Sequence, residues 1–293
     1  MLFRAALAAL LAPVPLVATA GGADAAPRAP AAPVTASSGD GTDWRCRPPA
    51  AHPNPVVLLH GLTGTGEGSW TYLGPRLRDA GYCVFTPTYG RITPDVEIGG
   101  LAPIAQSAQE VAAFVDQVRA ATGAARVDIV GHSEGGFLGL YLPKVLGLSG
   151  QVERVVALAP PTHGTTVSGL VTFADVLGIR PLVDELLRTF GCAACADTLP
   201  GAPPVAALTA GPIARPGVAY TIVATRADLV VTPSGSAFVR EPGVRNVHVQ
   251  DVCPFDPVGH VGLALDRSVL GIVLNALDPA HARPVHCGVG IPF

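Results

Sequence analysis

A serine framed by glycines, at the point where an expected strand meets an expected helix, constrains the fold of this chain more than any other feature. The segment Gly131-His132-Ser133-Glu134-Gly135 directly follows the β-branched run Arg126–Val130 and precedes a helical pattern over Phe137–Val145. A tight strand-to-helix turn strains the serine backbone, and side chains two residues before and after it would clash with neighbouring elements. Such a turn lifts the hydroxyl out of the sheet. The pattern therefore predicts that Ser133 is a nucleophile at the end of a buried strand.

Apolar runs typical of buried strands alternate with amphipathic helical patterns along the rest of the chain. The expected strands are Pro55–Leu59, Tyr82–Thr86, Arg126–Val130, Val152–Leu158, Val218–Ala224 and Val244–Val249. The expected helices are Trp70–Ala80, Pro103–Thr122 with Gly123 as its cap, Phe137–Val145 and Asp266–Leu277. This alternation predicts the α/β class, with a mainly parallel sheet covered by helices on both faces.

The segment 162–216 interrupts the alternation and is long for a simple connection between two strands. It contains two short amphipathic patterns, Ser168–Leu177 and Pro181–Phe190. We interpret it as a cap or lid insertion within one catalytic domain, residues 44–293. Its apolar side chains should line an acyl-binding cleft, although they could instead pack the cap onto the sheet.

The first residues have the pattern of a cleavable secretory signal. Arg4 precedes the apolar run Ala5–Val17, and small residues follow at spacings suited to cleavage. The run is shorter than the roughly 20 residues that span a bilayer. We predict a signal peptide over residues 1–25 and a flexible leader over 26–43, whose Ala, Pro, Gly and Ser residues cannot bury a core. The chain should therefore be secreted, without a transmembrane anchor.

The cysteines agree with an oxidising compartment. All six, Cys46, Cys83, Cys192, Cys195, Cys253 and Cys287, follow the proposed signal peptide. An even number in a secreted chain predicts three disulfides, and about 15 connectivities are open. Of these we expect Cys46–Cys83, Cys192–Cys195 and Cys253–Cys287. Cys192 and Cys195 could instead form a redox or zinc half-site, but the sequence has no second Cys-x-x-Cys and no histidine beside this one.

A serine hydroxyl needs a base within reach and a third group that orients the base. In folds with such a turn, the acid and then the histidine follow the serine along the chain. His260 lies in a loop between the last strand and the closing helix and is the expected base, with His286 as a reserve. Asp228 follows the strand Val218–Ala224 and is the expected acid. Asp251 and Asp256 remain alternatives.

The oxyanion hole needs two backbone N–H donors that point at the developing negative charge. One should come from Glu134, the residue after the nucleophile. The other should come from Leu62, in the Gly-rich loop after the first strand. His60 should hold this loop by hydrogen bonds without touching substrate.

Together these motifs resemble the secreted class 2 lipases of actinobacteria, in the α/β-hydrolase superfamily. The similar stretches are Val56–Leu62, Gly81–Phe85, Gly131–Gly136, His163–Thr166, Ala224–Asp228 and Asp251–Pro254, followed by His260. The resemblance covers nearly all of the chain after Trp44. It implies an α/β-hydrolase fold and hydrolysis of acylglycerols or similar lipid-like esters, with Ser133, Asp228 and His260 as the triad.

Two points stay open within this resemblance. An acyltransferase of the same fold, or a polyester-cleaving or short-chain esterase, would use the same triad. Glu134 also departs from the Gln or Met that is more common after the serine in related enzymes. A carboxylate beside the oxyanion hole would disfavour the developing charge unless it points to solvent.

The amino-acid composition limits the classes of molecule that this chain is expected to bind. The net charge is -3 and charged residues make up 14%, so no basic surface for nucleic acid is indicated. Hydrophobic residues make up 49%, enough for a sizeable core. We expect a monomer that needs no metal or other cofactor and meets a lipid-like ester substrate at a lipid–water interface.

Overall fold

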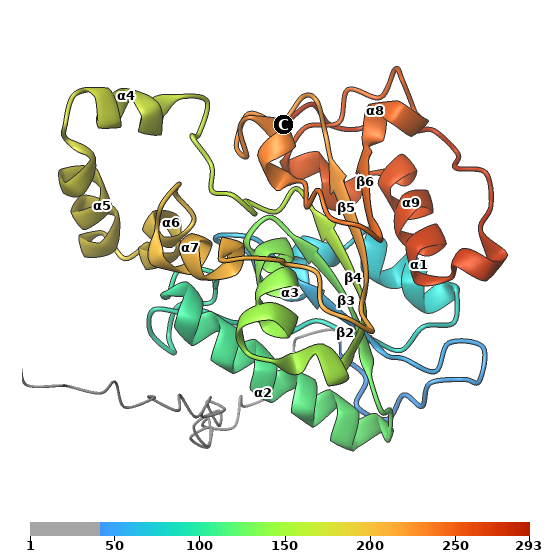
Figure 1. Cartoon of the computed structure of the whole chain (residues 1–293). Coiled ribbons are helices and arrows are strands. Elements are labelled where there is room, and N and C mark those ends of the chain that lie inside the picture. Colours follow the sequence, from blue (N-terminus) through green and yellow to red (C-terminus); the bar gives the residue numbers. More distant parts are fainter. Residues whose placement is uncertain (1–41) are drawn as a thin grey trace, which may run out of the picture. The chain divides into compact units, whose positions relative to one another are not determined.

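The computed structural model describes residues 42–293, so the predicted signal peptide 1–25 and nearly all of the predicted leader 26–43 lie outside it. At its centre is a six-stranded sheet in the order β2-β1-β3-β4-β5-β6, and every neighbouring pair is parallel (Figure 1). The strands are β1 Val56–Leu59, β2 Val84–Phe85, β3 Val127–His132, β4 Val152–Leu158, β5 Ala219–Ala224 and β6 Val244–His248. The predicted mainly parallel α/β sheet is confirmed.

Helices cover both faces of the sheet. On one face are α2, Ile104–Thr122, and α3, Glu134–Val145; on the other are α1, Leu73–Asp79, and α9, Arg267–Leu277. A short helix, α8 Val249–Val252, follows β6. Successive residues of β1 alternate between the two cores, with Val57 in one and Val56 in the other. The continuous apolar runs of the sequence therefore reflect strands buried on both faces.

Local signals explain where several elements begin and end. The side chain of Asp266 accepts a hydrogen bond from Val269 N at 2.9 Å and so caps the start of α9. Gly123, with a φ of 73°, ends α2 as expected. The helix expected over Trp70–Ala80 is shorter, because α1 begins only at Leu73 after a 3-10 turn. Pro75 fits this start, since its missing N–H would have no partner in a first turn.

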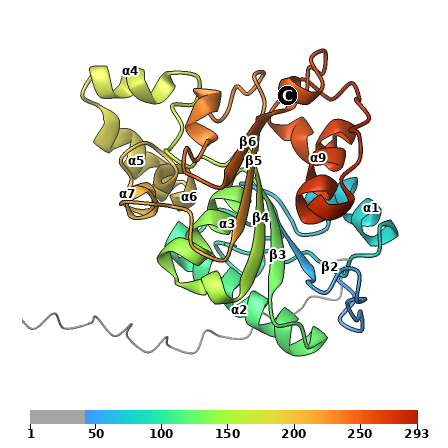
Figure 2. The same cartoon turned by 45° about the vertical axis from the view of Figure 1, so that its right-hand side comes forward.

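Four helices lie between β4 and β5. They are α4 Leu170–Val176, α5 Arg180–Thr189, α6 Ala193–Asp197 and α7 Pro203–Thr209. Two of them, α4 and α5, occupy the two predicted amphipathic segments. The others were not expected, and α7 packs Val205 and Leu208 into the same core as α3. In both ribbon views α4 lies farther from the sheet than α6 (Figures 1 and 2).

The structure contains the three expected disulfides, Cys46–Cys83, Cys192–Cys195 and Cys253–Cys287. The first joins the segment before β1 to the residue before β2. The third joins the loop after α8 to the C-terminal segment. Among residues 42–293, no helix has the length and apolar character needed to cross a bilayer.

Candidate active site

Ser133 lies in a strained turn between β3 and α3. Its backbone has φ 54° and ψ −120°, a conformation that costs energy for any residue with a side chain. The backbone N–H of Ser133 stabilises the turn by donating to Leu158 O at 2.8 Å. A Cβ on Gly131 would lie 2.2 Å from Gly135 O, and one on Gly135 would lie 2.1 Å from Leu59 O. Both glycines are therefore required by close backbone approach, as the motif predicted.

His260 and Asp228 form a buried hydrogen-bonded pair. Nδ1 of His260 lies 2.9 Å from Oδ2 of Asp228, and the two side chains are 6% and 1% exposed. Because a carboxylate only accepts, Nδ1 carries the proton and Nε2 of the neutral ring has a free lone pair. The other carboxylate oxygen of Asp228 accepts from the N–H groups of Val230 and Val231 at 2.8 Å each. The ring of His260 is thus oriented by a carboxylate that is itself fixed.

The alternative acids are engaged elsewhere. Asp251 is exposed, pairs with Arg226 and accepts from His248 N at 3.0 Å. Asp256 accepts from Val258 N at 3.1 Å and from the hydroxyl of Ser268. Of the three candidate acids, only Asp228 contacts the ring of His260 within the described residues.

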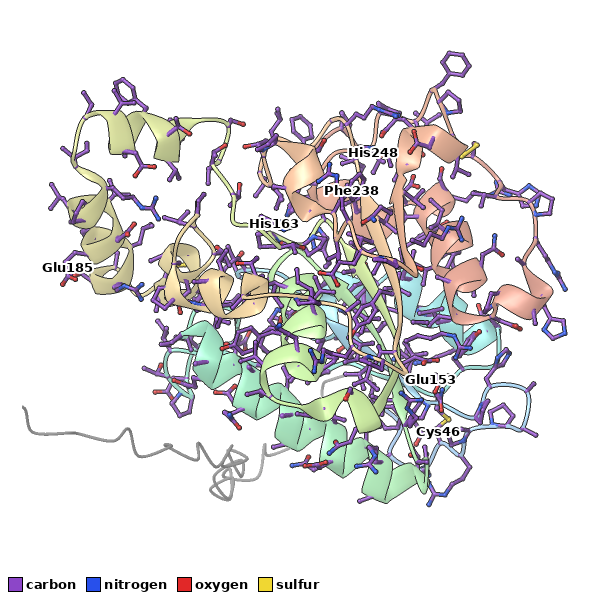
Figure 3. The ribbon with its side chains drawn as sticks, viewed as in Figure 1. Cys46, Glu153, His163, Glu185, Phe238 and His248 are labelled. Carbon is purple, nitrogen blue, oxygen red and sulfur yellow. A yellow bond between two sulfur atoms is a disulfide. The ribbon has the colours of Figure 1, made fainter. Side chains whose placement is uncertain are left out.

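Other histidines have structural partners. Figure 3 labels two of them, His163 and His248. His163 donates from Nδ1 to Ser236 O at 2.8 Å, and the ring of His248 lies edge-on to Phe238 at 4.6 Å between centroids. The reserve candidate His286 lies on the rim of a separate cavity. No hydrogen bond or ring contact joins these three histidines to the Ser133 turn within the described residues, whereas the ring of His260 lies 4.9 Å from that of His132, the residue before Ser133, measured between centroids.

The parallel sheet brings these groups to one edge. Ser133 follows β3, Asp228 follows β5 and His260 follows β6, and the carboxyl ends of parallel strands share an edge. A direct link joins the first and last of these segments: Nε2 of His132 donates to the backbone oxygen of His260 at 2.9 Å. Burial lowers the pKa of His132 to about 3, so its ring is neutral at neutral pH. Sequence reasoning missed this bracing role, for which the only signal was its place beside the serine.

The two expected oxyanion donors lie at the same edge. Glu134 is the first residue of α3, and the loop that contains Leu62 approaches the turn so closely that a Cβ on Gly61 would lie 3.0 Å from Ser133 Cβ. Neither the Leu62 N–H nor the Glu134 N–H donates a hydrogen bond within residues 42–293. Both groups are therefore available to an oxyanion.

His60 supports, from the protein interior, the loop after β1 that contains Gly61 and Leu62, here called the oxyanion loop. Its Nδ1 donates to Gly61 O at 2.8 Å, and its Nε2 accepts from Tyr89 N at 3.3 Å. The hydroxyl of Tyr89 donates to His60 O, and the two rings stack at 4.2 Å between centroids. Burial lowers the pKa of His60 to about 4. The ring is fully buried and neutral, in agreement with the expected supporting role.

The Glu134 side chain does not point to solvent, which was the orientation that would have kept its charge away from the oxyanion. It is 1% exposed, and neither carboxyl oxygen has a hydrogen-bond partner among the described residues. Burial, followed by the nearby carboxylates Asp197 and Glu110, raises the pKa of Glu134 to about 8. At neutral pH the side chain is therefore mainly a neutral acid.

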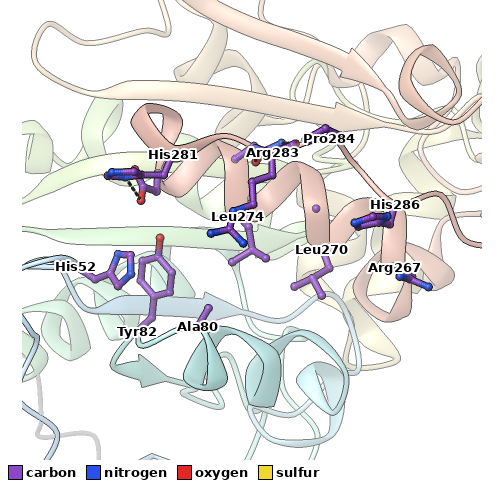
Figure 4. A pocket seen from close by; sticks show the side chains of 13 residues that line it. His52, Ala80, Tyr82, Arg267, Leu270, Leu274, His281, Arg283, Pro284 and His286 are labelled. Carbon is purple, nitrogen blue, oxygen red and sulfur yellow. Dashed lines mark hydrogen bonds and ion pairs between the residues drawn. The ribbon is translucent and has the colours of Figure 1, made fainter.

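A cavity of about 460 Å³ lies away from these groups, between α9, the end of α1 and the segment that follows α9 (Figure 4). Leu270 and Leu274 of α9 contribute apolar walls, and His52 and Tyr82 precede β1 and β2. It therefore reaches toward the amino ends of the strands, and neither Ser133, Asp228 nor His260 lines it.

Comparison with known proteins points to lipases. The family described as Lipase (class 2) matches residues 53–172. Triacylglycerol lipases of Pseudarthrobacter phenanthrenivorans and Burkholderia plantarii are each 31% identical over 137 residues, which is 45% of this chain. The matches cover only 40% and 36% of those relatives, so the similarity spans less than half of their lengths.

Among solved structures, lipase B of Aspergillus fumigatus superposes with a TM-score of 0.61 and 19% identity. The superposition covers 86% of this chain and 56% of that one. At this identity the likeness concerns the fold. The chain thus has the α/β-hydrolase fold, and its residues 53–172, which include the Ser133 turn, are similar to class 2 lipases.

Proposed function

We propose that this chain is a secreted serine hydrolase that cleaves carboxylic esters of lipid-like molecules such as acylglycerols. The observation that carries the proposal is the buried pair of His260 and Asp228 beside the strained Ser133 turn. The similarity of residues 53–172 to class 2 lipases supports the same reaction class. The signal-like N-terminus and the three disulfides support secretion.

The proposed reaction proceeds through an acyl-enzyme. The Ser133 hydroxyl attacks the ester carbonyl carbon while Nε2 of His260 takes its proton, and Asp228 stabilises the resulting imidazolium. The carbonyl oxygen becomes negative and accepts from the N–H groups of Leu62 and Glu134. As the tetrahedral intermediate collapses, the alcohol leaves with the proton from His260. Water then attacks the acyl-serine, with His260 again as base, and the acid product departs as His260 returns the proton to the Ser133 oxygen.

Exposed apolar side chains around the site support a lipid-like substrate. Leu229, next to Asp228, is 66% exposed, and Val261, next to His260, is 58% exposed. On α4 and α5, Phe173 and Leu182 are also largely exposed, so the cap is not simply packed onto the sheet. Exposed apolar side chains next to the acid and the base favour contact with an acyl chain.

The test is a series of p-nitrophenyl esters from acetyl to palmitoyl, with Ser133→Ala as the blank. Each methylene buried on binding contributes about 0.8 kcal/mol, so kcat/KM should be higher for butyryl to decanoyl esters than for acetyl. EDTA should leave the rate unchanged. Best activity on acetyl esters with none on octanoyl esters would contradict the lipid-like substrate and leave a short-chain esterase. Transfer products in the presence of an added alcohol would instead identify an acyltransferase.

A further inference from the structure

Glu134 combines two roles in one residue at the start of α3. Its backbone N–H is available to the oxyanion, while its side chain turns into the protein interior. Both carboxyl oxygens are buried without a hydrogen-bond partner among the described residues. An ionised carboxylate in such a place loses its hydration and gains nothing in return. The surroundings therefore favour the protonated form.

The titratable groups around this carboxyl come from several elements and offer it no cation. Asp197, at the end of α6, and Glu110, in α2, are the acids that act on it. Tyr89 lies on the loop after β2. Burial raises the pKa of Tyr89, and the charge of an ionised Glu134 would raise it further. The neighbouring His60 is neutral, because burial lowers its pKa to about 4.

Two arginines of this region leave the carboxyl unpaired. Arg188 pairs with Asp197 at 2.9 Å, whereas the charge of Arg91, whose buried Nε has no hydrogen-bond partner among the described residues, helps to lower the pKa of His60. Neither arginine forms an ion pair with Glu134 in residues 42–293. The negative charge of an ionised Glu134 would therefore be uncompensated.

The carboxyl shares a confined space with the oxyanion loop. A Cβ on Gly100 would lie 2.5 Å from Oε2 of Glu134 and 2.9 Å from Gly61 O. Gly61 directly precedes Leu62, the expected oxyanion donor. Because a carbonyl oxygen carries a partial negative charge, it repels a carboxylate more than it repels a neutral, protonated carboxyl.

We propose that the side chain of Glu134 is a proton-controlled positioning group: protonated, it permits the active geometry of the oxyanion loop, and loss of its proton switches acyl transfer off. This inference rests on the proposed ester hydrolysis. The proton goes to solvent, and no covalent bond changes. The charge left behind lies beside the site where the substrate oxygen becomes negative, and the two like charges repel in a region from which water is excluded.

The experiment is a profile of kcat from pH 6 to pH 10 for the wild type, Glu134→Gln and Glu67→Gln. Gln has nearly the shape of a protonated Glu and cannot ionise. We expect the wild-type kcat to fall by about tenfold or more between pH 7 and pH 10, and Glu134→Gln to show no such fall. Glu67 is exposed, so Glu67→Gln should fall like the wild type. Removing the charge of Glu110 in Glu110→Gln should move the fall to lower pH, because that charge opposes ionisation of Glu134.

A second measurement does not depend on activity. An unfolded Glu134 ionises near its ordinary pKa, 4.5, whereas the folded one keeps its proton to about pH 8. Between these values the folded state binds more protons, so the free energy of unfolding of the wild type should fall with pH relative to that of Glu134→Gln, and the difference should level off above pH 8. Denaturant unfolding of both proteins at several pH values measures this difference.

The outcomes separate this inference from the proposed function. An unfolding difference that does not change with pH would mean that Glu134 is already ionised in the folded protein, and would overturn the inference even in an active esterase. The same holds if wild-type kcat stays level to pH 10, or if Glu134→Gln falls equally. Absence of any ester hydrolysis at pH 7 would instead overturn the proposed function, and the switch of acyl transfer with it.

Discussion

The carboxylate of Asp228 accepts three hydrogen bonds, and their arrangement decides which nitrogen of His260 carries a proton. Oδ1 accepts from Val230 N and Val231 N, and Oδ2 accepts from Nδ1 of His260. In an Asp228→Asn variant the amide oxygen would keep the two backbone donors, so the NH2 group would face Nδ1. Nδ1 would then have to accept, and Nε2 would hold the proton and cease to be a base.

We therefore expect Asp228→Asn to lower kcat for ester hydrolysis by a factor on the order of 10³ to 10⁴, with a much smaller change in KM. Asp251→Asn is the matched control, because Asp251 is exposed and pairs with Arg226. It should stay near wild-type activity. Steady-state kinetics on one p-nitrophenyl ester compares the two variants. If Asp251→Asn were the more damaging change, the acid would be wrongly assigned.

At the scale of elements, the C-terminal segment 288–293 braces the loop that presents His260. The N–H groups of Gly259 and Gly262 donate to Ile291 O and Phe293 O, both at 2.8 Å, so hydrogen bonds flank the histidine. Asp256 adds a further tie, because it accepts from Gly290 N at 3.0 Å. The disulfide Cys253–Cys287 anchors the same segment. The loop is thus positioned by a part of the chain that contributes no reacting group.

Deleting residues 291–293 should lower kcat while leaving the fold intact, because both acceptors beside His260 are lost. A displacement of about 1 Å can cost on the order of a hundredfold in rate, so a loss of about tenfold to a hundredfold is expected. The control is Phe293→Ala: the side chain is 73% exposed, and the backbone oxygen remains. Circular dichroism checks the fold, and kinetics gives kcat and KM. A folded deletion variant with wild-type kcat would show that the brace is dispensable.

At the scale of the whole molecule, the sheet and the order of its site residues could be predicted because both follow from local sequence. The run Val152–Leu158 has the same bounds in the sequence prediction and in β4. Ser133, Asp228 and His260 follow three different strands, and parallel strands end at one edge. The order along the chain is then sufficient to expect these residues close together.

Other features depend on long-range packing and were not predictable. The sequence places Glu134 after the serine, but a residue at the first position of a helix can face solvent or the interior. Helix α6 has only 5 residues, too few to show a helical period, and α7 begins with Pro203-Pro204, a pair that in sequence is typical of a loop. The contacts of Ile291 and Phe293 with the His260 loop join residues that are about thirty apart, and no local pattern announces them.

The claim on which the rest of the account depends is that Ser133 is the nucleophile, and covalent labelling tests it most directly. The protein is incubated with an alkyl phosphonate ester that carries a good leaving group, and the adduct is located by intact mass and peptide mapping. We expect one phosphonyl group per chain, on the peptide that contains Ser133, with a parallel loss of ester hydrolysis and no adduct on Ser133→Ala. An adduct on a different residue, or a Ser133→Ala variant with more than about a tenth of wild-type turnover, would contradict it.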